Sequence, residues 1–217
     1  METKKTGFGI YSITEQNRPV PGCTISGEIL PGVQCFSLAG GTDISAESYP
    51  ILVLLYNLEG SIAVFDADHG KETGVGAGEF LVKTAGRNIG VRTPEDSVYL
   101  EITLGKENQM NHVIHAGEVF QLKELVPYQD GKIVNMDIAS NSHMKFVVMA
   151  FDEGTGLSEH AAPGDAIVFA LEGNAVIGYE GKEYPITAGQ QFRFAKGGLH
   201  SVKADGKFKM ALLLVLE

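Results

Sequence analysis

The feature that most limits the possible folds of this chain is that it contains one pattern twice. Residues 40–60, GGTDISAESYPILVLLYNLEG, align without a gap with residues 153–173, EGTGLSEHAAPGDAIVFALEG. The glycine-threonine pair, the proline and the closing Leu-Glu-Gly coincide. Residues 75–86 then align with residues 186–197, after a hairpin that is two residues longer in the first copy. A period of about 110 residues is too long for a solenoid, so the sequence indicates a duplicated domain.

Short apolar segments separated by glycine-containing turns run through both copies. In the second half they cover residues 145–151, 166–171, 174–180, 182–187, 190–194, 200–204 and 208–217. This pattern is typical of an all-β sandwich or barrel. Helical periodicity is weak, and we expect only one or two helical turns, within residues 118–125. The polar, glycine-led segment GKENQMNH (105–112) is the predicted linker. It gives an N-terminal barrel over residues 1–106 and a C-terminal barrel over residues 107–217.

Composition excludes some classes of partner. The chain has 17 Lys and Arg against 27 Asp and Glu, a net charge of −10, and no local basic cluster. Such a surface repels phosphate backbones and anionic lipids, so we expect neither a nucleic-acid nor a membrane partner. Cys23 and Cys35 form no C-x-x-C pair, and METKKTGFGIYSIT lacks the apolar region of a signal peptide. We therefore expect reduced thiols in a cytoplasmic protein.

The C-terminal copy resembles the cupins, a family with two motifs, G-x5-H-x-H-x3,4-E-x6-G and G-x5-P-x-G-x2-H-x3-N. The first motif maps onto Gly154, His160 and Gly173. The second maps onto Gly189, Gly197 and His200, with Ala195 and Ala204 where the family has proline and asparagine. The resemblance covers most of residues 113–217 and, in weaker form, residues 28–104. The whole chain is thus similar to the two-domain bicupins, which implies two tandem double-stranded β-helix (jelly-roll) barrels.

The resemblance implies a metal site that this chain retains only in part. In metal-binding cupins, three histidines and one carboxylate bind Fe, Mn, Zn, Ni or Cu. Alternation along a strand aims both rings of H-x-H into the barrel. Here Ala162 stands at the second histidine position and Ala166 at the carboxylate position, so only His160 and His200 remain. Two imidazoles are fewer than the three protein ligands of an open catalytic zinc site.

One interpretation of this site is a small-molecule pocket with weak or no metal. The ligand would lie around His160, His200 and Glu159, with Phe192 and Phe194 lining the pocket. Two histidines that titrate near neutral pH can bind a carboxylate or shuttle a proton without a metal. We expect a ligand with a flat or apolar body and one polar group.

Two other interpretations stay open. In the first, the protein is a metal-dependent oxygenase or isomerase, in which the two histidines and Glu159, Asp165 or His143 hold a divalent ion of Zn, Fe, Mn or Ni. Regular alternation aims Glu159 to the opposite face, and Asp165 lies one residue from the family position. In the second, the protein is structural and its own side chains fill the C-terminal pocket. The chain has no G-x-S-x-G, Walker A or G-x-G-x-x-G motif in a fitting context, and no catalytic residue is assigned.

The N-terminal copy keeps no imidazole at any family position. Glu47 occupies the position of His160, Ile89 that of His200, and Val53 replaces the carboxylate. We therefore expect this barrel to bind no metal and to serve a structural role by pairing with the second barrel. A bicupin can satisfy barrel pairing within one chain, so we expect a monomer or a homodimer in solution.

Overall fold

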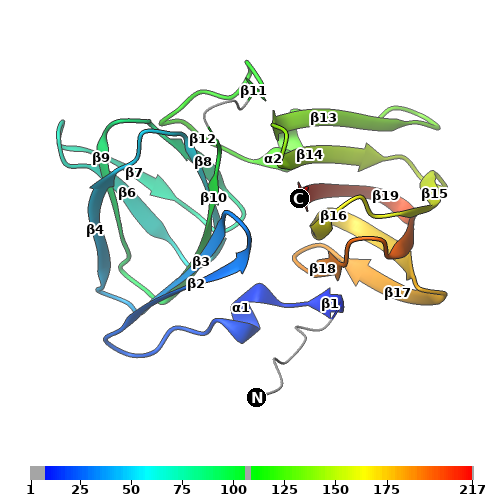
Figure 1. Cartoon of the computed structure of the whole chain (residues 1–217), viewed down its shortest axis with the longest axis horizontal. Helices are drawn as coiled ribbons and strands as arrows, with labels where there is room; N and C mark the ends of the chain where they lie inside the picture. The colour runs from blue at the N-terminus through cyan, green and yellow to red at the C-terminus, as the bar shows by residue number, and fades with distance from the viewer. Residues whose placement is uncertain (1–7, 106–108, 217) are drawn as a thin grey trace. The chain divides into compact units, whose positions relative to one another are not determined.

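A computed structural model of the chain describes residues 8–105 and 109–216, and these are mostly strands (Figure 1). The helices among them are α1 (Ile13–Gln16) and α2 (Leu122–Leu125), of four residues each. α2 lies within residues 118–125, where the sequence predicted a helical turn. In the part of the chain that the structure describes, no helix is long and apolar enough to cross a membrane.

The chain divides into two compact units. The N-terminal barrel is Ile13–Gln121, and the C-terminal barrel combines Met1–Ser12 with Leu122–Glu217. This division differs from the predicted boundary between residues 106 and 107, because two short strands pair outside their own half of the sequence. β1 (Gly9–Tyr11) pairs with β18 (Gln191–Phe194), and β12 (Val119–Phe120) pairs with β8 (Phe80–Lys83). Each added strand satisfies the backbone groups of a strand that would otherwise be an open sheet edge.

The predicted linker is described only in part. Of residues 105–112, residues 106–108 lie outside the described residues. β11 (Gln109–Met110) directly follows this segment. The described part of the predicted linker thus includes a short strand.

The N-terminal barrel consists of two antiparallel sheets. One has the strand order β12-β8-β5-β10-β3-β2, and the other has the order β4-β9-β6-β7. The strands not yet given are β2 (Thr24–Leu30), β3 (Val33–Leu38), β4 (Asp43–Ser48), β5 (Val53–Glu59), β6 (Ile62–Asp66), β7 (Lys71–Val75), β9 (Asn88–Arg92) and β10 (Ser97–Thr103). Their inward side chains form a core that includes Leu38, Leu55, Leu81, Val91 and Tyr99.

The C-terminal barrel is built on two long strands. Its path runs β1-β18-β16-β19-β14-β13, with β15 on β19 and β17 on β16. The strands are β13 (Ile133–Ser140), β14 (Met144–Phe151), β15 (Gly156–Ala161), β16 (Asp165–Tyr179), β17 (Lys182–Thr187) and β19 (Leu199–Val215). The sequence predicted breaks within β16 and β19, but register shifts near Gly173 let both strands continue. Two jelly-roll barrels with little helix, as predicted, are confirmed.

The strand register confirms the internal repeat. His160 is the cross-strand partner of His200 between β15 and β19, as Glu47 is of Ile89 between β4 and β9. The glycines that close the aligned segments also match. Gly60 and Gly173 have φ values of 73° and 75°. A Cβ at either position would overlap a backbone carbonyl oxygen of the neighbouring chain segment, so both positions require glycine.

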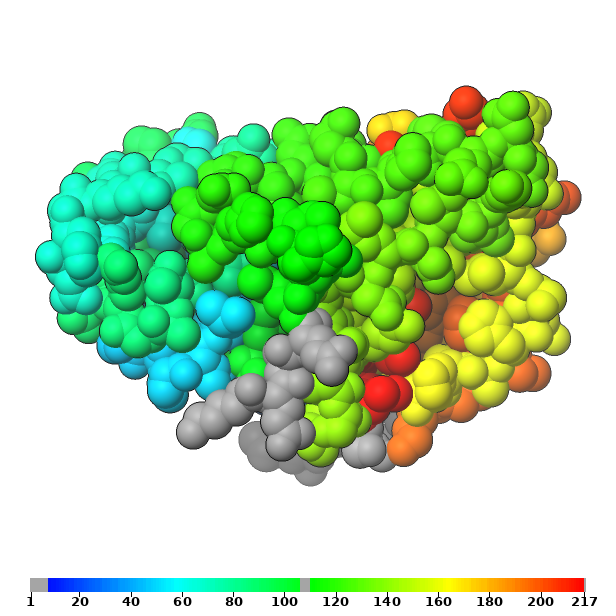
Figure 2. All heavy atoms as spheres, turned by 90° about the horizontal axis from the view of Figure 1, so that it is seen from above, coloured from blue at the N-terminus to red at the C-terminus, as the bar shows by residue number. Residues whose placement is uncertain are grey.

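Polar groups on the outside of the C-terminal barrel are solvated. In the space-filling view of Figure 2, residues of β13 and β14 appear in green at the surface. There Lys145 Nζ lies 3.2 Å from Asp137 Oδ1, and both side chains are about half exposed. Water screens this exposed ion pair, so it contributes little to stability.

The two cysteines are free thiols, as predicted. Cys23 is exposed and Cys35 is buried. Burial raises the pKa of the Cys35 thiol to about 12, against a smaller lowering by its hydrogen bond with Ser37. Cys35 is therefore a protonated, unreactive core residue at neutral pH.

Candidate functional site

The two histidines retained from the family motif lie together in the C-terminal barrel. His160 on β15 and His200 on β19 are direct cross-strand partners. Their ring centroids are 4.2 Å apart, and the ring planes are inclined by 51°. His160 is exposed to solvent, whereas only 7% of the His200 surface is exposed. One ring of the pair therefore lies in the core, and the other lies at the surface of the barrel.

Backbone carbonyls fix the tautomers of both rings. His160 Nδ1 lies 2.8 Å from the carbonyl oxygen of Ser158, and His200 Nδ1 lies 3.2 Å from that of Gly198. A carbonyl oxygen only accepts, so each Nδ1 donates and each neutral ring keeps a lone pair on Nε2. Burial lowers the pKa of His200 below its usual 6.5, and His160 lowers it further, against a raising effect of the hydrogen bond to Gly198. His200 is therefore a neutral electron-pair donor at pH 7.

Aromatic rings fill the inner side of this pair. The Phe194 ring centroid lies 4.2 Å from that of His200, and the Phe192 centroid lies 4.9 Å from that of Phe194. Both phenylalanines are buried in the core, together with Ala162 and Ala166 at the two vacated ligand positions. Their role in lining a ligand pocket stays a prediction, while their role in the core is observed.

The carboxylates considered as additional ligands do not gather at the pair. Glu159 is exposed, in a segment where the register shifts between Leu157 and His160. Asp165 Oδ1 accepts the backbone N–H of Lys196 at 2.9 Å. Within residues 8–105 and 109–216, no His, Cys, Asp or Glu joins the pair to make three ligand atoms within 4.8 Å of one another. The arrangement supplies two imidazole ligands, short of the three or four of known zinc sites.

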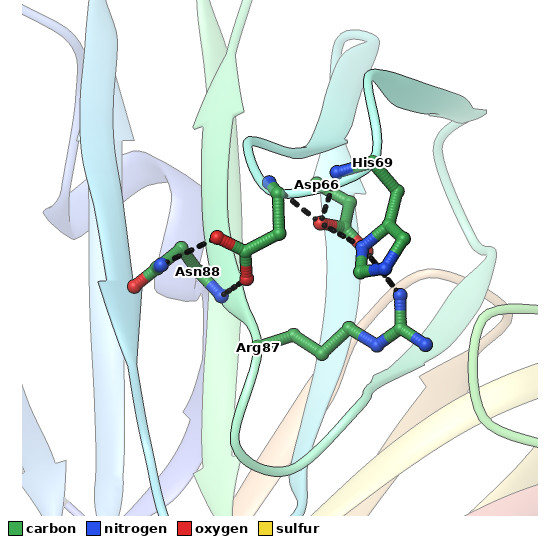
Figure 3. Close-up of polar contacts among 5 residues, drawn as sticks. Asp66, His69, Arg87 and Asn88 are labelled. Atoms are coloured by element: carbon green, nitrogen blue, oxygen red, sulfur yellow. Dashed lines mark hydrogen bonds and ion pairs between the residues drawn. The ribbon is translucent and has the colours of Figure 1, made fainter.

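One group of three potential metal ligands does occur among the described residues, in the β6–β7 turn of the N-terminal barrel. It consists of Asp66, Asp68 and His69 (Figure 3). Arg87 Nη1 lies 3.0 Å from Asp66 Oδ2 and 2.6 Å from His69 Nδ1. The Asp68 carboxylate accepts the backbone and side-chain N–H groups of Asn88. A guanidinium thus already serves as the cation of this group, and we interpret it as a turn-stabilising network.

The N-terminal barrel contains a buried ion pair that the sequence did not predict. Lys83 Nζ lies 2.5 Å from Glu101 Oε1, and the two side chains are 6% and 9% exposed. Lys83 follows Leu81 by two residues on β8, and Glu101 follows Tyr99 by two on β10. Leu81 and Tyr99 belong to the barrel core, so alternation directs both charged side chains to the interior.

A second polar pair lies at the former metal-ligand positions of this barrel. Tyr49, two residues after Glu47 as in H-x-H, donates its hydroxyl to Glu47 Oε2 at 2.7 Å. This hydrogen bond is the main cause that raises the pKa of Tyr49 to about 12. The i, i+2 spacing of Glu47 and Tyr49 was a signal in the sequence that could have identified this pair.

Comparisons with known proteins identify the fold. A family model described as a cupin domain matches residues 147–216. A comparison with curated proteins gave no match. Among solved structures, the chain is similar to a cupin 2 conserved barrel domain protein from Leptotrichia buccalis. The two share 26% sequence identity with a TM-score of 0.81, over 99% of this chain and 98% of that one.

Two more distant structures share the fold. A salicylate 1,2-dioxygenase from Pseudaminobacter salicylatoxidans is 10% identical, with a TM-score of 0.66 over 98% of this chain and 85% of that one. Protein Ylba from E. coli is 11% identical, with a TM-score of 0.61 over 99% and 93%. The C-terminal barrel therefore contains a cupin domain, and almost the whole chain shares the fold of a cupin barrel protein.

Proposed function

We propose that the C-terminal barrel binds a small molecule at His160 and His200, with weak or no metal. The observation that carries this proposal is the pair of neighbouring imidazoles whose Nδ1 atoms are held by backbone carbonyls. Their free Nε2 lone pairs suit a ligand with a hydrogen-bond donor, such as the hydroxyl group of a phenol. A flat apolar body on that ligand would match the aromatic neighbours of His200.

A second candidate is a metal-dependent oxygenase or isomerase of the cupin type. It is favoured by the same hydrogen bonds, because histidines that bind metals commonly donate their other N–H to a carbonyl or carboxylate. Zn, Fe, Mn or Ni would be held by His160 and His200 with Glu159 or Asp165, and when bound would act as a Lewis acid. One structural neighbour is a salicylate dioxygenase, but that likeness extends to the fold alone.

Elemental analysis separates these two functions. The chain is purified without a histidine tag and measured before and after incubation with Fe(II), Zn(II) and Mn(II), beside the variant His200→Ala. The first proposal expects no stoichiometric metal in either protein. A stoichiometric metal that disappears in His200→Ala would overturn it in favour of the metal enzyme.

Ligand binding is tested directly by calorimetry with phenol and salicylate, which carry a hydroxyl donor, as probes. Binding that is lost in His160→Ala and His200→Ala, and retained in a variant of the exposed His143, supports the pocket. The same affinity in all variants would show that the histidines are not the site.

The cellular setting stays part of the proposal. We infer a cytoplasmic protein without nucleic-acid or membrane partners. Its barrels pair with each other or with those of a second copy, so the protein is a monomer or a homodimer. The net charge of −10 supports the inference that nucleic acids and membranes are not partners. Size-exclusion chromatography with light scattering gives the oligomeric state, and a species larger than a dimer would contradict this inference.

A further inference from the structure

The N-terminal barrel contains a cavity that opens to solvent and has a mixed polar and apolar lining. It measures about 260 Å³, and its polar lining comes from Ser26, Ser45, Glu47, Tyr49, Lys83 and Glu101. The buried ion pair and the Glu47–Tyr49 pair therefore border the same space. This volume is slightly below the usual range of ligand pockets, so it suits a small metabolite.

A second cavity of about 290 Å³ adjoins the first, because Lys83 and Ile89 line both. Its charged lining adds Lys71, Arg87 and Asp66. The Asp66 carboxylate is already paired with Arg87 at 3.0 Å. The second cavity is therefore cationic, whereas the first has two carboxylates against one ammonium.

The polar groups at the first cavity have hydrogen-bonding capacity to spare. The Lys83 ammonium has three N–H groups, and within the described residues it donates only to Glu101. Tyr99, which stacks on the cavity-lining Phe36 with centroids 4.9 Å apart, has a buried hydroxyl without a partner among these residues. Buried polar groups are normally satisfied, so the unused N–H groups of Lys83, which lines the cavity, indicate a missing partner.

Stability does not explain why the ion pair is there. A buried salt bridge is commonly no more stabilising than apolar side chains of similar size. The aligned positions of the C-terminal barrel show that alternative, with Phe194 in place of Lys83 and Leu212 in place of Glu101. The charges of the N-terminal barrel are therefore better explained by binding.

We propose that the N-terminal barrel binds a small amphoteric molecule of the amino-acid class, without a metal. The ligand carboxylate lies toward Lys71 and Lys83, and its ammonium lies toward Glu47 and Glu101. A simple anion would face the two glutamates, and a simple amine would face the two lysines, so neither matches both cavities. This site is independent of the one proposed in the C-terminal barrel.

The ligand class is tested by calorimetry on the full chain with a matched panel of probes. The panel contains the L-α-amino acids, the carboxylic acids that lack their ammonium group, the amines that lack their carboxylate, and glycerol and glucose as polyols. We expect at least one amino acid to bind about tenfold or more tightly than its matched acid and amine, because each lost charged hydrogen bond has that effect. No binding by any amino acid, or equal binding of matched acids, amines or polyols, would overturn the proposal.

The location is tested with variants of the ion pair. Glu101→Gln keeps the shape of the side chain and removes its charge, and we expect about tenfold weaker binding or complete loss. The combined variant Lys83→Phe with Glu101→Leu introduces the residues of the C-terminal barrel, and we expect it to fold but not to bind. Lys145→Met, which removes an exposed ion pair in the other unit, is the matched control and binds as the parent chain does.

Circular dichroism shows whether each variant is folded before its binding is measured. Unchanged binding in a folded Glu101→Gln variant contradicts the location. His160 and His200 are intact in all these variants, so a failure here leaves the proposal for the C-terminal barrel standing.

Discussion

The two barrels share a strand register but differ in what their interiors contain. Equivalent cross-strand partners on aligned strands are Glu47 with Ile89 in one barrel and His160 with His200 in the other. The backbone ladder thus holds the register in both barrels, whatever side chains the positions carry. The comparison shows that a duplicated barrel can change the side chains at its site positions without changing its strand pairing.

The replacement also changes how the interior is filled. Phe194 packs against His200 in the C-terminal barrel, while the aligned Lys83 pairs with Glu101 beside a cavity of about 260 Å³. An aromatic ring packs through many van der Waals contacts, whereas the charged pair interacts mainly through one hydrogen bond. One barrel therefore has aromatic rings beside its histidines, and the other has a charged pair beside an open cavity.

The largest expected effect comes from breaking the buried pair. Lys83→Met leaves the Glu101 carboxylate buried without a partner, so we expect the free energy of unfolding to fall by about 3–5 kcal/mol. Lys145→Met breaks an exposed pair and should lower it by at most about 1 kcal/mol. Urea denaturation followed by circular dichroism measures both. Similar small losses in the two variants would show that the pair is solvated.

The next effect tests whether the two barrels depend equally on their closing glycines. Gly60→Ala and Gly173→Ala each combine a left-handed backbone with overlap on a carbonyl oxygen, so we expect a loss of about 3 kcal/mol in each. Gly206 has a similar φ of 79° but open space around it. Gly206→Ala should therefore cost only about 1–2 kcal/mol. Equal losses at all three positions in thermal unfolding would show that the overlap has no effect.

A smaller effect is expected when one interior is converted into the other. In Lys83→Phe with Glu101→Leu, no charge is left unpaired, so the free energy of unfolding should stay the same or rise by about 1 kcal/mol. The same denaturation experiment compares this variant with Lys83→Met. A loss larger than that of Lys83→Met would show that the N-terminal barrel cannot accept an apolar interior.

The smallest effect concerns pH and distinguishes the histidine barrel. The pKa of His200 is lowered in the folded chain, chiefly by burial, so the unfolded chain takes up this proton more readily just below pH 6.5. Stability should therefore decrease as the pH falls through this window and show no such contribution above it. The melting temperature should drop less between pH 7.5 and 5.5 in His200→Asn than in the parent chain. His143→Asn, at an exposed histidine, should behave as the parent chain does.

The sequence predicted the repeat, the strands and the histidine pair because these depend on local patterns. Alternating apolar residues and glycine turns indicated the strands. The two cupin motifs identified His160 and His200 as site residues. The continuity of β16 was missed because Gly173, which in the structure allows a register shift within the strand, also has the appearance of a turn residue.

Features that depend on distant pairing could not be predicted. Lys83 and Glu101 are 18 residues apart and meet only because β8 and β10 both flank β5. In the sequence, Lys83 stands at the end of a strand, where a lysine is usually solvated. The pairing of β1 with β18 depends on a three-residue strand, too short to be recognised from its composition.

The pairing of β1 with β18 also sets an order for folding during synthesis. Gly9 pairs with Arg193, so the β1 strand is made 193 − 9 = 184 residues before its partner. At about 5–20 residues per second, β1 waits roughly 10–40 s on the ribosome. All strands of the two N-terminal sheets precede Gln121, so their pairing partners are made within that interval. The C-terminal barrel is completed last, by the joining of one of the first strands made to one of the last.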